Sequence, residues 1–319
     1  MVPLPKYNLD DIKQVLEDTS GYPFELSIVR RVENYEEFGY WVQANYSFED
    51  QDTGEARELD FHAMKAETVS LQKDEFVFAT ILGSCKANKY PCVFFTRDLP
   101  PRGNQLNSDI PIAGCPLEIF PTDSNDSEDI NLYFQLYGLL HIAKAQTISS
   151  QFCELVQKKS KWEVRSQVMF KNTYIPILKI ISTEMEEENK SSKPKIGESS
   201  PEYTINYPLI IMKGPIYEYY SPPSGDTILR ETKHIVFTRH YKSKKIKCCY
   251  AVDVIHESYL ESYLDVINNE LKEFANLVRK HQEVLVQSIR RLAEIEEKKD
   301  KNVGIEQNEE EERYLQIRR

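Results

Sequence analysis

The stretch Glu75 to Lys86, EFVFATILGSCK, says most about the fold. It is apolar on both faces as far as Gly83, which is typical of a central strand covered on both sides. Ser84 and Lys86 lie two positions apart, so their side chains project from the same face at the end of this strand. The stretch therefore predicts both the middle of a sheet and a rigid place for polar chemistry.

Two strand-like runs precede this stretch, Tyr40 to Phe48 and Ala56 to Met64, and the turn-rich segment EDQDTGE joins them. This arrangement predicts a hairpin. Because side chains alternate along a strand, the second run has two different faces. One face carries Leu59, Phe61 and Ala63, and the other carries Glu58, Asp60 and His62.

Helical patterns occupy the chain before the hairpin. We expect a short polar helix over about Leu9 to Asp18 and a second helix that begins near Pro23. In the second helix Glu25 precedes three apolar residues by three, four and seven positions, namely Ile28, Val29 and Val32. The Glu25 carboxylate then shares an apolar stripe and points inward, which is costly unless something binds it.

The chain beyond the central strand predicts an irregular region followed by helices. Leu99 to Asp129 is rich in Pro, Asn, Ser and Asp, which is typical of a long insertion. Helical patterns follow over Leu132 to Ala145, Ser149 to Lys159 and Tyr174 to Glu188. The charged, Ser- and Lys-rich residues 187–201 predict a mobile loop. Pro208 to Gly214 then predicts a buried strand, and a strand pair is expected around the basic turn Lys242 to Lys247.

Residues 257–298 predict a long C-terminal helix with a heptad pattern. The seam holds Leu260, Leu264, Ile267, Leu271, Phe274, Val278 and Leu285, with His281 in the remaining position. Such a seam most often packs on its own domain. The alternative is a coiled coil that joins two copies as a homodimer. The charged residues 299–319 predict a flexible tail.

Composition limits the classes of function. With 319 residues and 40% hydrophobic content, the chain can bury one large core or two modest ones. No apolar run is long enough for a membrane span, and the N-terminal MVPLPKYNLDD lacks the apolar core of a secretory signal, so we expect a cytoplasmic protein with no membrane partner. Six scattered cysteines without metal-ligand spacing predict reduced thiols.

Three stretches carry a resemblance to a known family: GYPFELSIVRRVE, DQDTGEARELDFHAMK and ILGSCKANKYPCVFF. They resemble the restriction-endonuclease-like PD-(D/E)XK nuclease superfamily, which combines a helix Glu, a strand Asp and a strand ending in an acidic residue, any residue and Lys. The resemblance implies a mixed α/β fold in which helices flank a central mixed four-stranded sheet. Residues 1–256 would form this core, with a helical insertion over residues 99–160.

The resemblance also implies a site. Asp60 would bind a catalytic Mg²⁺ or Mn²⁺ directly, Glu25 would hold it directly or through water, and Lys86 would orient the attacking water and offset transition-state charge. Ser84 departs from the pattern, because the family has an acidic ligand there. Two repairs are open: Glu58 leans into the site, or a water fills the position. Taken alone, Glu25 is equally explained as a cap, as a partner of Arg57 or as a surface charge.

The resemblance implies a metal-dependent DNA endonuclease-like phosphodiesterase with weakened metal binding. The alternative is a catalytically impaired nuclease-fold module that binds nucleic acid or a protein, and a third reading is an accidental match in another mixed α/β protein. The net charge of −11 opposes nonspecific attraction to DNA, so binding must rest on local patches. Candidate contacts are Arg239, Lys242, Lys244, Lys245 and Lys247 in KHIVFTRHYKSKKIK, and the alternative for them is a solvated hairpin tip.

Overall fold

The EFVFATILGSCK stretch forms β3, Glu75–Lys86, and it lies inside the sheet as expected. On one side β3 pairs antiparallel with β2, Ala56–Ser70, and on the other it pairs parallel with β8, Tyr203–Met212. Residues 79–85 of β3 and every residue of β8 are buried. Apolar sequence on both faces therefore corresponds to a strand that is covered on both faces.

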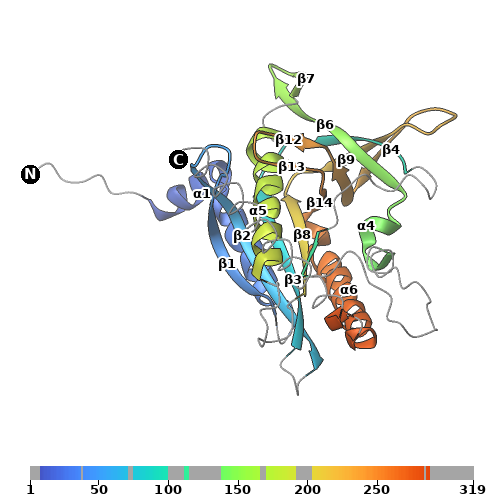
Figure 1. The fold of residues 1–319 in the computed structure, drawn as a ribbon. Coiled ribbons are helices and arrows are strands. Elements are labelled where there is room, and N and C mark those ends of the chain that lie inside the picture. The colour runs from blue at the N-terminus through green and yellow to red at the C-terminus, as the bar shows by residue number, and fades with distance from the viewer. Residues whose placement is uncertain are drawn as a thin grey trace, which may run out of the picture.

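A computed structural model of the chain describes residues 8–36, 39–70, 75–99, 111–114, 138–165, 170–191, 203–283 and 285–287. The fold is mixed α/β, with one large mixed sheet and helices against it (Figure 1). β1, Trp41–Glu49, forms the expected hairpin with β2, with Glu49 opposite Ala56 across the turn. In β2, Leu59, Phe61 and Ala63 are buried and Glu58 is exposed. The expected shared face is confirmed for Phe61 and Ala63, which pack with α2 and α6, but Leu59 packs in the core beside α5.

Helices cover both faces of this part of the sheet. α2, Tyr22–Glu33, and α6, Leu260–Lys280, pack on the face that carries Phe61 and Leu209. α5, Ile175–Ser191, follows a π-helical turn at Phe170–Tyr174 and packs on the opposite face with Leu82 and Ile210. α1, Leu9–Thr19, precedes α2, and a 3-10 turn at Glu257–Tyr259 leads into α6.

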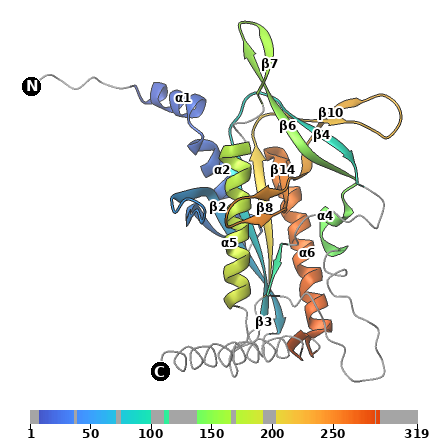
Figure 2. The ribbon, with the colours of Figure 1, turned by 45° about the horizontal axis from the view of Figure 1, so that its top comes forward.

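The sheet continues well beyond these strands, in the order β1-β2-β3-β8-β14-β11-β6-β4-β9-β10. The added strands are β14 (Ala251–His256), β11 (His234–Thr238), β6 (Thr147–Lys158), β4 (Cys92–Asp98), β9 (Ile216–Tyr220) and β10 (Ile228–Thr232). β5, Ile112–Ala113, pairs with β8, and β7, Lys161–Arg165, pairs with β6. The β6–β7 hairpin and the β10 region project away from the helices (Figure 2). The sheet is thus larger than the four strands expected.

The helix expected over Ser149 to Lys159 is wrong, because these residues form most of β6. β6 pairs with β4 and β11, which buries Ile148, Phe152 and Cys153. Lys159 and Ser160 follow with φ of +45° and +66°, the left-handed pair that a two-residue hairpin turn requires, and β7 then returns along β6. Sheet pairing that is remote in sequence overrides the local helical pattern.

The helix expected over Leu132 to Ala145 is described only in its second half. There the regular helix is the four-residue α4, His141–Lys144, because Leu140 has extended backbone. Residues 132–137 lie outside the described residues. The loop expected at residues 187–201 begins too early, since α5 continues to Ser191.

The heptad seam packs on its own domain, which was the first of the two interpretations of this pattern. All of its residues from Leu260 to Val278, and Leu285 beyond them, are buried against the chain's own sheet. This described part of the seam therefore has no free apolar face for a coiled coil with a second copy. The tail at 299–319 lies outside the described residues.

Two smaller findings concern the helices and the cysteines. Among the described residues, no helix has the length and apolar content needed to cross a membrane. No disulfide joins the cysteines that the structure describes, and all of these are buried: Cys85, Cys92, Cys153, Cys248 and Cys249. Cys115 lies outside the described residues.

Candidate functional site

Asp60 and Ser84 face each other across the β2–β3 pair. The paired register of β2 and β3 ends at Phe61 and Gly83, and Asp60 and Ser84 are the next residues of the two strands. The Ser84 hydroxyl donates to Asp60 Oδ2 at 3.0 Å, and the backbone N–H of Cys85 donates to the same oxygen. Lys86 Nζ lies 3.9 Å from it. Two neighbouring strands thus bring together three of the residues that the sequence singled out.

Glu25 reaches this group from the first turn of α2. Pro23 near the helix start sets the backbone there, and Phe24, Ile28 and Val29 are buried, as the apolar stripe predicts. The Glu25 side chain is half-buried. Burial raises the pKa of Glu25, the nearby Asp60 carboxylate raises it further, and Lys86 partly offsets both effects. Glu25 is therefore close enough to interact electrostatically with both Asp60 and Lys86.

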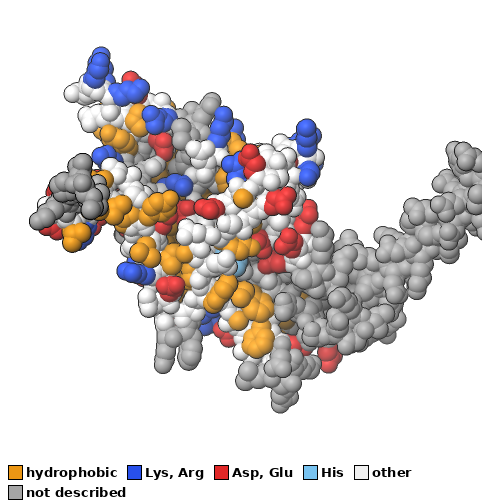
Figure 3. Space-filling model, turned by 90° about the vertical axis from the view of Figure 1, so that its left-hand side faces the viewer, with side chains coloured by type: hydrophobic (Ala, Val, Ile, Leu, Met, Phe, Trp, Pro, Cys, Tyr) orange, Lys and Arg blue, Asp and Glu red, His pale blue; other side chains and the backbone are white. Residues whose placement is uncertain are grey.

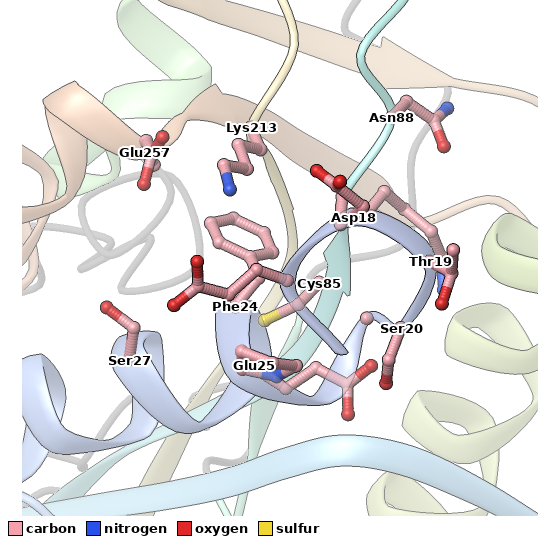
Figure 4. A pocket seen from close by; sticks show the side chains of 15 residues that line it. Asp18, Thr19, Ser20, Phe24, Glu25, Ser27, Cys85, Asn88, Lys213 and Glu257 are labelled. Carbon is pink, nitrogen blue, oxygen red and sulfur yellow. The ribbon is translucent and has the colours of Figure 1, made fainter. Parts of the chain in front are cut away.

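A pocket of about 540 Å³ lies at this end of the strands. Figure 4 shows Glu25 beside Ser20, with Lys213 and Glu257 across the pocket from them. Its charged lining consists of four carboxylates and two lysines: Glu17, Asp18, Glu25, Glu257, Lys86 and Lys213. The pocket carries an excess of negative charge, which favours a cation and opposes a bare phosphate.

Among the described contacts, no further carboxylate joins Asp60 and Glu25. Ser84 is only 6% exposed, and its neutral hydroxyl occupies the position where the resemblance predicts a carboxylate. Glu58 is exposed, and among the described contacts it makes none with this group. His62 stacks on Tyr46 with 4.7 Å between ring centroids, and burial lowers its pKa. Of the two repairs, the one that uses Glu58 has no support in the geometry.

The basic turn forms the expected strand pair, β12 (Tyr241–Lys242) and β13 (Lys247–Cys248). It rests on the β1–β2 turn, because the Ser243 hydroxyl donates to Asp52 Oδ1 at 2.7 Å and the Tyr241 hydroxyl to Asp52 Oδ2 at 3.2 Å. The candidate DNA contacts, Arg239, Lys242, Lys244, Lys245 and Lys247, are all exposed. The guanidinium of Arg239 also lies 4.2 Å from the centre of the Phe170 ring. The tip is solvated, but its backbone is anchored.

The structure also contains a buried polar cluster that the sequence analysis did not anticipate. Asp253 on β14 lies beside His141, His234 and Tyr263, and His141 also contacts Glu270 on α6. One signal for it was present in the sequence: Asp253 is the single charged residue within the apolar strand AVDVI. A lone acid in a doubly buried strand demands partners, but one of them, His141, lies 112 positions away in the chain.

Comparisons with protein-family models, with curated proteins and with solved structures found no match to this chain.

Proposed function

We propose that this chain is a metal-dependent DNA endonuclease-like phosphodiesterase with a restriction-endonuclease-like core. The observation that carries the proposal is the convergence of Glu25, Asp60 and Lys86 at the ends of β2 and β3, beside an open pocket. Two further facts support it. The elements follow the order α2, β1, β2, β3, α5 and β8, and β8 runs parallel to β3 at the far side of the β1–β2–β3 meander.

The donor set at this end of the strands fits Mg²⁺ or Mn²⁺, which take hard oxygen ligands and keep several waters. Asp60 and Glu25 supply two carboxylates. The contacts from Ser84, Cys85 and Lys86 all use Asp60 Oδ2, and none of them uses Oδ1, the oxygen left for an ion. Burial and mutual repulsion disfavour two carboxylates without a cation, in line with the raised pKa of Glu25.

Each side chain has a role that follows from its position. When bound, the metal would supply a nucleophilic hydroxide and a template for in-line displacement at phosphorus. Asp60 would hold it directly, and Glu25 would hold it directly or through water. Lys86 keeps a positive charge beside Asp60, where it orients water and offsets the charge that develops on the phosphoryl oxygens.

DNA contact would rest on local basic groups, because the net charge is negative. On the face drawn in Figure 3, Lys and Arg side chains gather toward the upper end, and no continuous basic band crosses the face. The anchored basic turn, Lys242 to Lys247, is one such group. It rests on the turn that precedes β2, and Asp60 lies about 13 Å along β2 from that strand's first residue. Lys213, which lines the pocket, is a second basic group.

The experiment is cleavage of supercoiled plasmid by the purified full chain with Mg²⁺ or Mn²⁺. We expect nicking that Asp60→Ala abolishes and that Lys86→Ala lowers about 100-fold. Asp226→Ala, at an exposed position away from the pocket, is the matched control and should cleave like the wild type. Equal nicking by Asp60→Ala and the wild type would contradict the proposal.

One observation favours a second candidate, the catalytically impaired module that binds nucleic acid or a protein. The Ser84 hydroxyl donates to Asp60 Oδ2 and Lys86 pairs with that oxygen, so the group is partly satisfied without any ion. Absence of cleavage across metals and across single- and double-stranded substrates, together with retained DNA binding, would establish this candidate.

A further inference from the structure

The cluster around Asp253 has the donor atoms and the layout of a metal centre. His141 Nε2 lies 2.9 Å from Asp253 Oδ2, and His234 Nε2 lies 2.7 Å from Asp253 Oδ1. One donor atom from each of these residues lies within 4.8 Å of the others. The three donors come from α4, β11 and β14, so three separate parts of the chain converge on one point.

The cluster lies apart from Asp60. Across the sheet Asp253 is in register with Leu209, Leu209 with Gly83, and Gly83 with Phe61. Ser84 belongs to the next row, together with Ile210 and Val254. Successive rows point to opposite faces, so Asp253 projects toward α6 with Phe61 and Leu209. Within the described chain, the pocket at Glu25 and Lys86 shares no lining residue with the pocket at His141 and His234, so the two carboxylates belong to two different sites.

The charge of the cluster calls for a cation. Asp253 is 2% exposed and Glu270 is 4% exposed. Their hydrogen-bond and ion partners in the described chain are histidines, tyrosines and a backbone N–H, with no Lys or Arg among them. Two carboxylates in an apolar interior are costly unless positive charge offsets them. Here that charge comes from the imidazoles or from an ion held between them.

The outer contacts have the form seen around metal-bound histidines. Glu270 accepts from the backbone N–H of His141, and Glu270 Oε1 lies 3.0 Å from His141 Nδ1. Tyr207 donates to Glu270 at 3.0 Å, and Tyr263 donates to Asp253 at 2.8 Å. A carboxylate on Nδ1 fixes the imidazole with Nε2 directed at the ion. A purely structural histidine does not need a carboxylate on each nitrogen.

The cluster is also accessible. His141 and His234 line a pocket of about 240 Å³, and their side chains are 15% and 26% exposed. Lys144 also lines the pocket. An ion with three protein ligands here has its remaining position toward the pocket, which is the arrangement of a site that accepts water or an anionic ligand.

We propose that His141 Nε2, His234 Nε2 and the Asp253 carboxylate bind a divalent transition-metal ion, with Glu270 orienting His141. Two imidazoles and one carboxylate suit Zn²⁺, Co²⁺ or Fe²⁺ and distinguish this site from the all-oxygen site at Asp60. Metal bonds of about 2.0–2.1 Å place neighbouring tetrahedral ligand atoms about 3.3 Å apart. The contacts of 2.7 and 2.9 Å between the histidines and Asp253 need to open by less than about 1 Å.

The test uses the full chain, stripped with a chelator and titrated with Co²⁺, whose visible absorption reports its ligands. We expect one strongly absorbing equivalent to bind at the histidines, Zn²⁺ to displace it, and His234→Ala to weaken its binding at least 100-fold. His240→Ala, at an exposed histidine outside the cluster, is the matched control, and Asp60→Ala, which removes only a ligand of the proposed Mg²⁺ site, should keep this absorbing equivalent. Thermal melts with Zn²⁺ and with chelator are measured on the wild type only. Zn²⁺ should raise its melting temperature.

A ligand exchange guards against a variant that merely misfolds. His234→Cys keeps a donor at this position and should add a thiolate-to-Co²⁺ charge-transfer band that the wild type lacks. No Co²⁺ uptake by the wild type, uptake unchanged in His234→Ala, or uptake lost in Asp60→Ala would overturn the proposal.

Discussion

Asp60 on β2 and Asp253 on β14 belong to one sheet, but their surroundings differ in almost every respect. The Asp60 side chain is 21% exposed beside an open pocket, and its partners are a hydroxyl, an amide and a lysine at 3.9 Å. The Asp253 side chain is 2% exposed, and imidazoles and a phenol surround it. Water can replace a lost partner at Asp60 but cannot at Asp253.

The pKa directions reflect this difference. Burial alone would raise the pKa of Asp253, but the contacts with His141 and His234 outweigh burial and lower it. The carboxylate is therefore held ionised by the protein itself. At the pocket beside α2, Glu25 shows the opposite behaviour, since burial and the nearby Asp60 raise its pKa. The surroundings of Asp253 thus favour the ionised carboxylate, whereas those of Glu25 oppose it.

The largest expected effect comes from removing each aspartate in turn. Asp253→Ala leaves His141 and Tyr263 without their buried acceptor, so the free energy of unfolding should fall by roughly 3–5 kcal/mol. Asp60→Ala should lower it by about 1 kcal/mol or less, because that site is open to water. Urea unfolding measures both, with Asp226→Ala as the surface control. An equal loss in the free energy of unfolding for Asp60→Ala and Asp253→Ala would contradict the difference between the two sites.

A third buried carboxylate provides a reference with a lysine as its cation. Lys179 Nζ lies 2.7 Å from Oδ1 of Asp50, which is 1% exposed, and 3.1 Å from Asp52 Oδ2. Lys179→Met leaves the Asp50 charge with the more exposed Arg57, 3.4 Å away, and should cost about 3 kcal/mol in urea unfolding at neutral pH. A loss below about 1 kcal/mol would show that burial at this site does not require a cation.

The same group predicts a pH dependence. Burial would raise the pKa of Asp52, but Ser243 and Lys179 outweigh it and lower the pKa from 3.8 to about 2. A lowered pKa contributes stability that is complete above 3.8 and is lost as the pH falls toward 2. Thermal melts between about pH 5 and pH 2 should show this loss in the wild type and a smaller one in Lys179→Met. Parallel curves for the two proteins would contradict the assignment.

Introducing an acid at Ser84 should make the site at Asp60 more similar in charge to the cluster at Asp253. Ser84→Glu adds a carboxylate opposite Asp60 and should tighten Mn²⁺ binding about 10-fold. Because Ser84 is 6% exposed, the same change should cost roughly 1–3 kcal/mol of stability without metal, and Mn²⁺ should recover part of it. Calorimetric titration measures the affinity. Ser84→Gln is the matched neutral control, and an equal gain for Ser84→Gln would rule out a role for charge.

The smallest effect is expected at the basic turn, where binding rather than stability should change. Lys244→Gln with Lys245→Gln removes two exposed charges and should lower the slope of log affinity for DNA against log salt by up to about 2. Lys159→Gln with Lys161→Gln, at the exposed β6–β7 tip, is the matched control. An unchanged slope in the first pair would remove this turn from the DNA contacts.

The elements near β3 were predictable because local pattern and tertiary environment agree there. Glu75 to Lys86 is apolar where both faces are covered, and EDQDTGE combines turn-forming residues between alternating runs. The approach of Ser84 and Lys86 to Asp60 follows from strand alternation once the β2–β3 register is known. These features depend on neighbours within about thirty residues in the chain.

The remainder depends on contacts that no local pattern contains. β6 is a strand because β4 and β11 lie on either side of it, although its residues also suit a helix. The metal-like cluster needs His141 from one connection and His234 from an unrelated strand, separated by 112 and 19 residues from Asp253. Glu270 is one of several charged residues in the heptad helix, and nothing in its sequence position distinguishes it from the others. Only the packing of α6 on the sheet buries it.

The register between β3 and β8 constrains how this protein can change over evolutionary time. Gly83 and Ser84 are consecutive residues, and through Leu209 and Ile210 they lead to opposite faces at Asp253 and Val254. Inserting or deleting one residue inside β3 would turn Ser84 away from Asp60, and the same change inside β14 would turn Asp253 away from its histidines. Selection can therefore alter each site through its side chains, whereas the lengths of the strands that carry them are fixed.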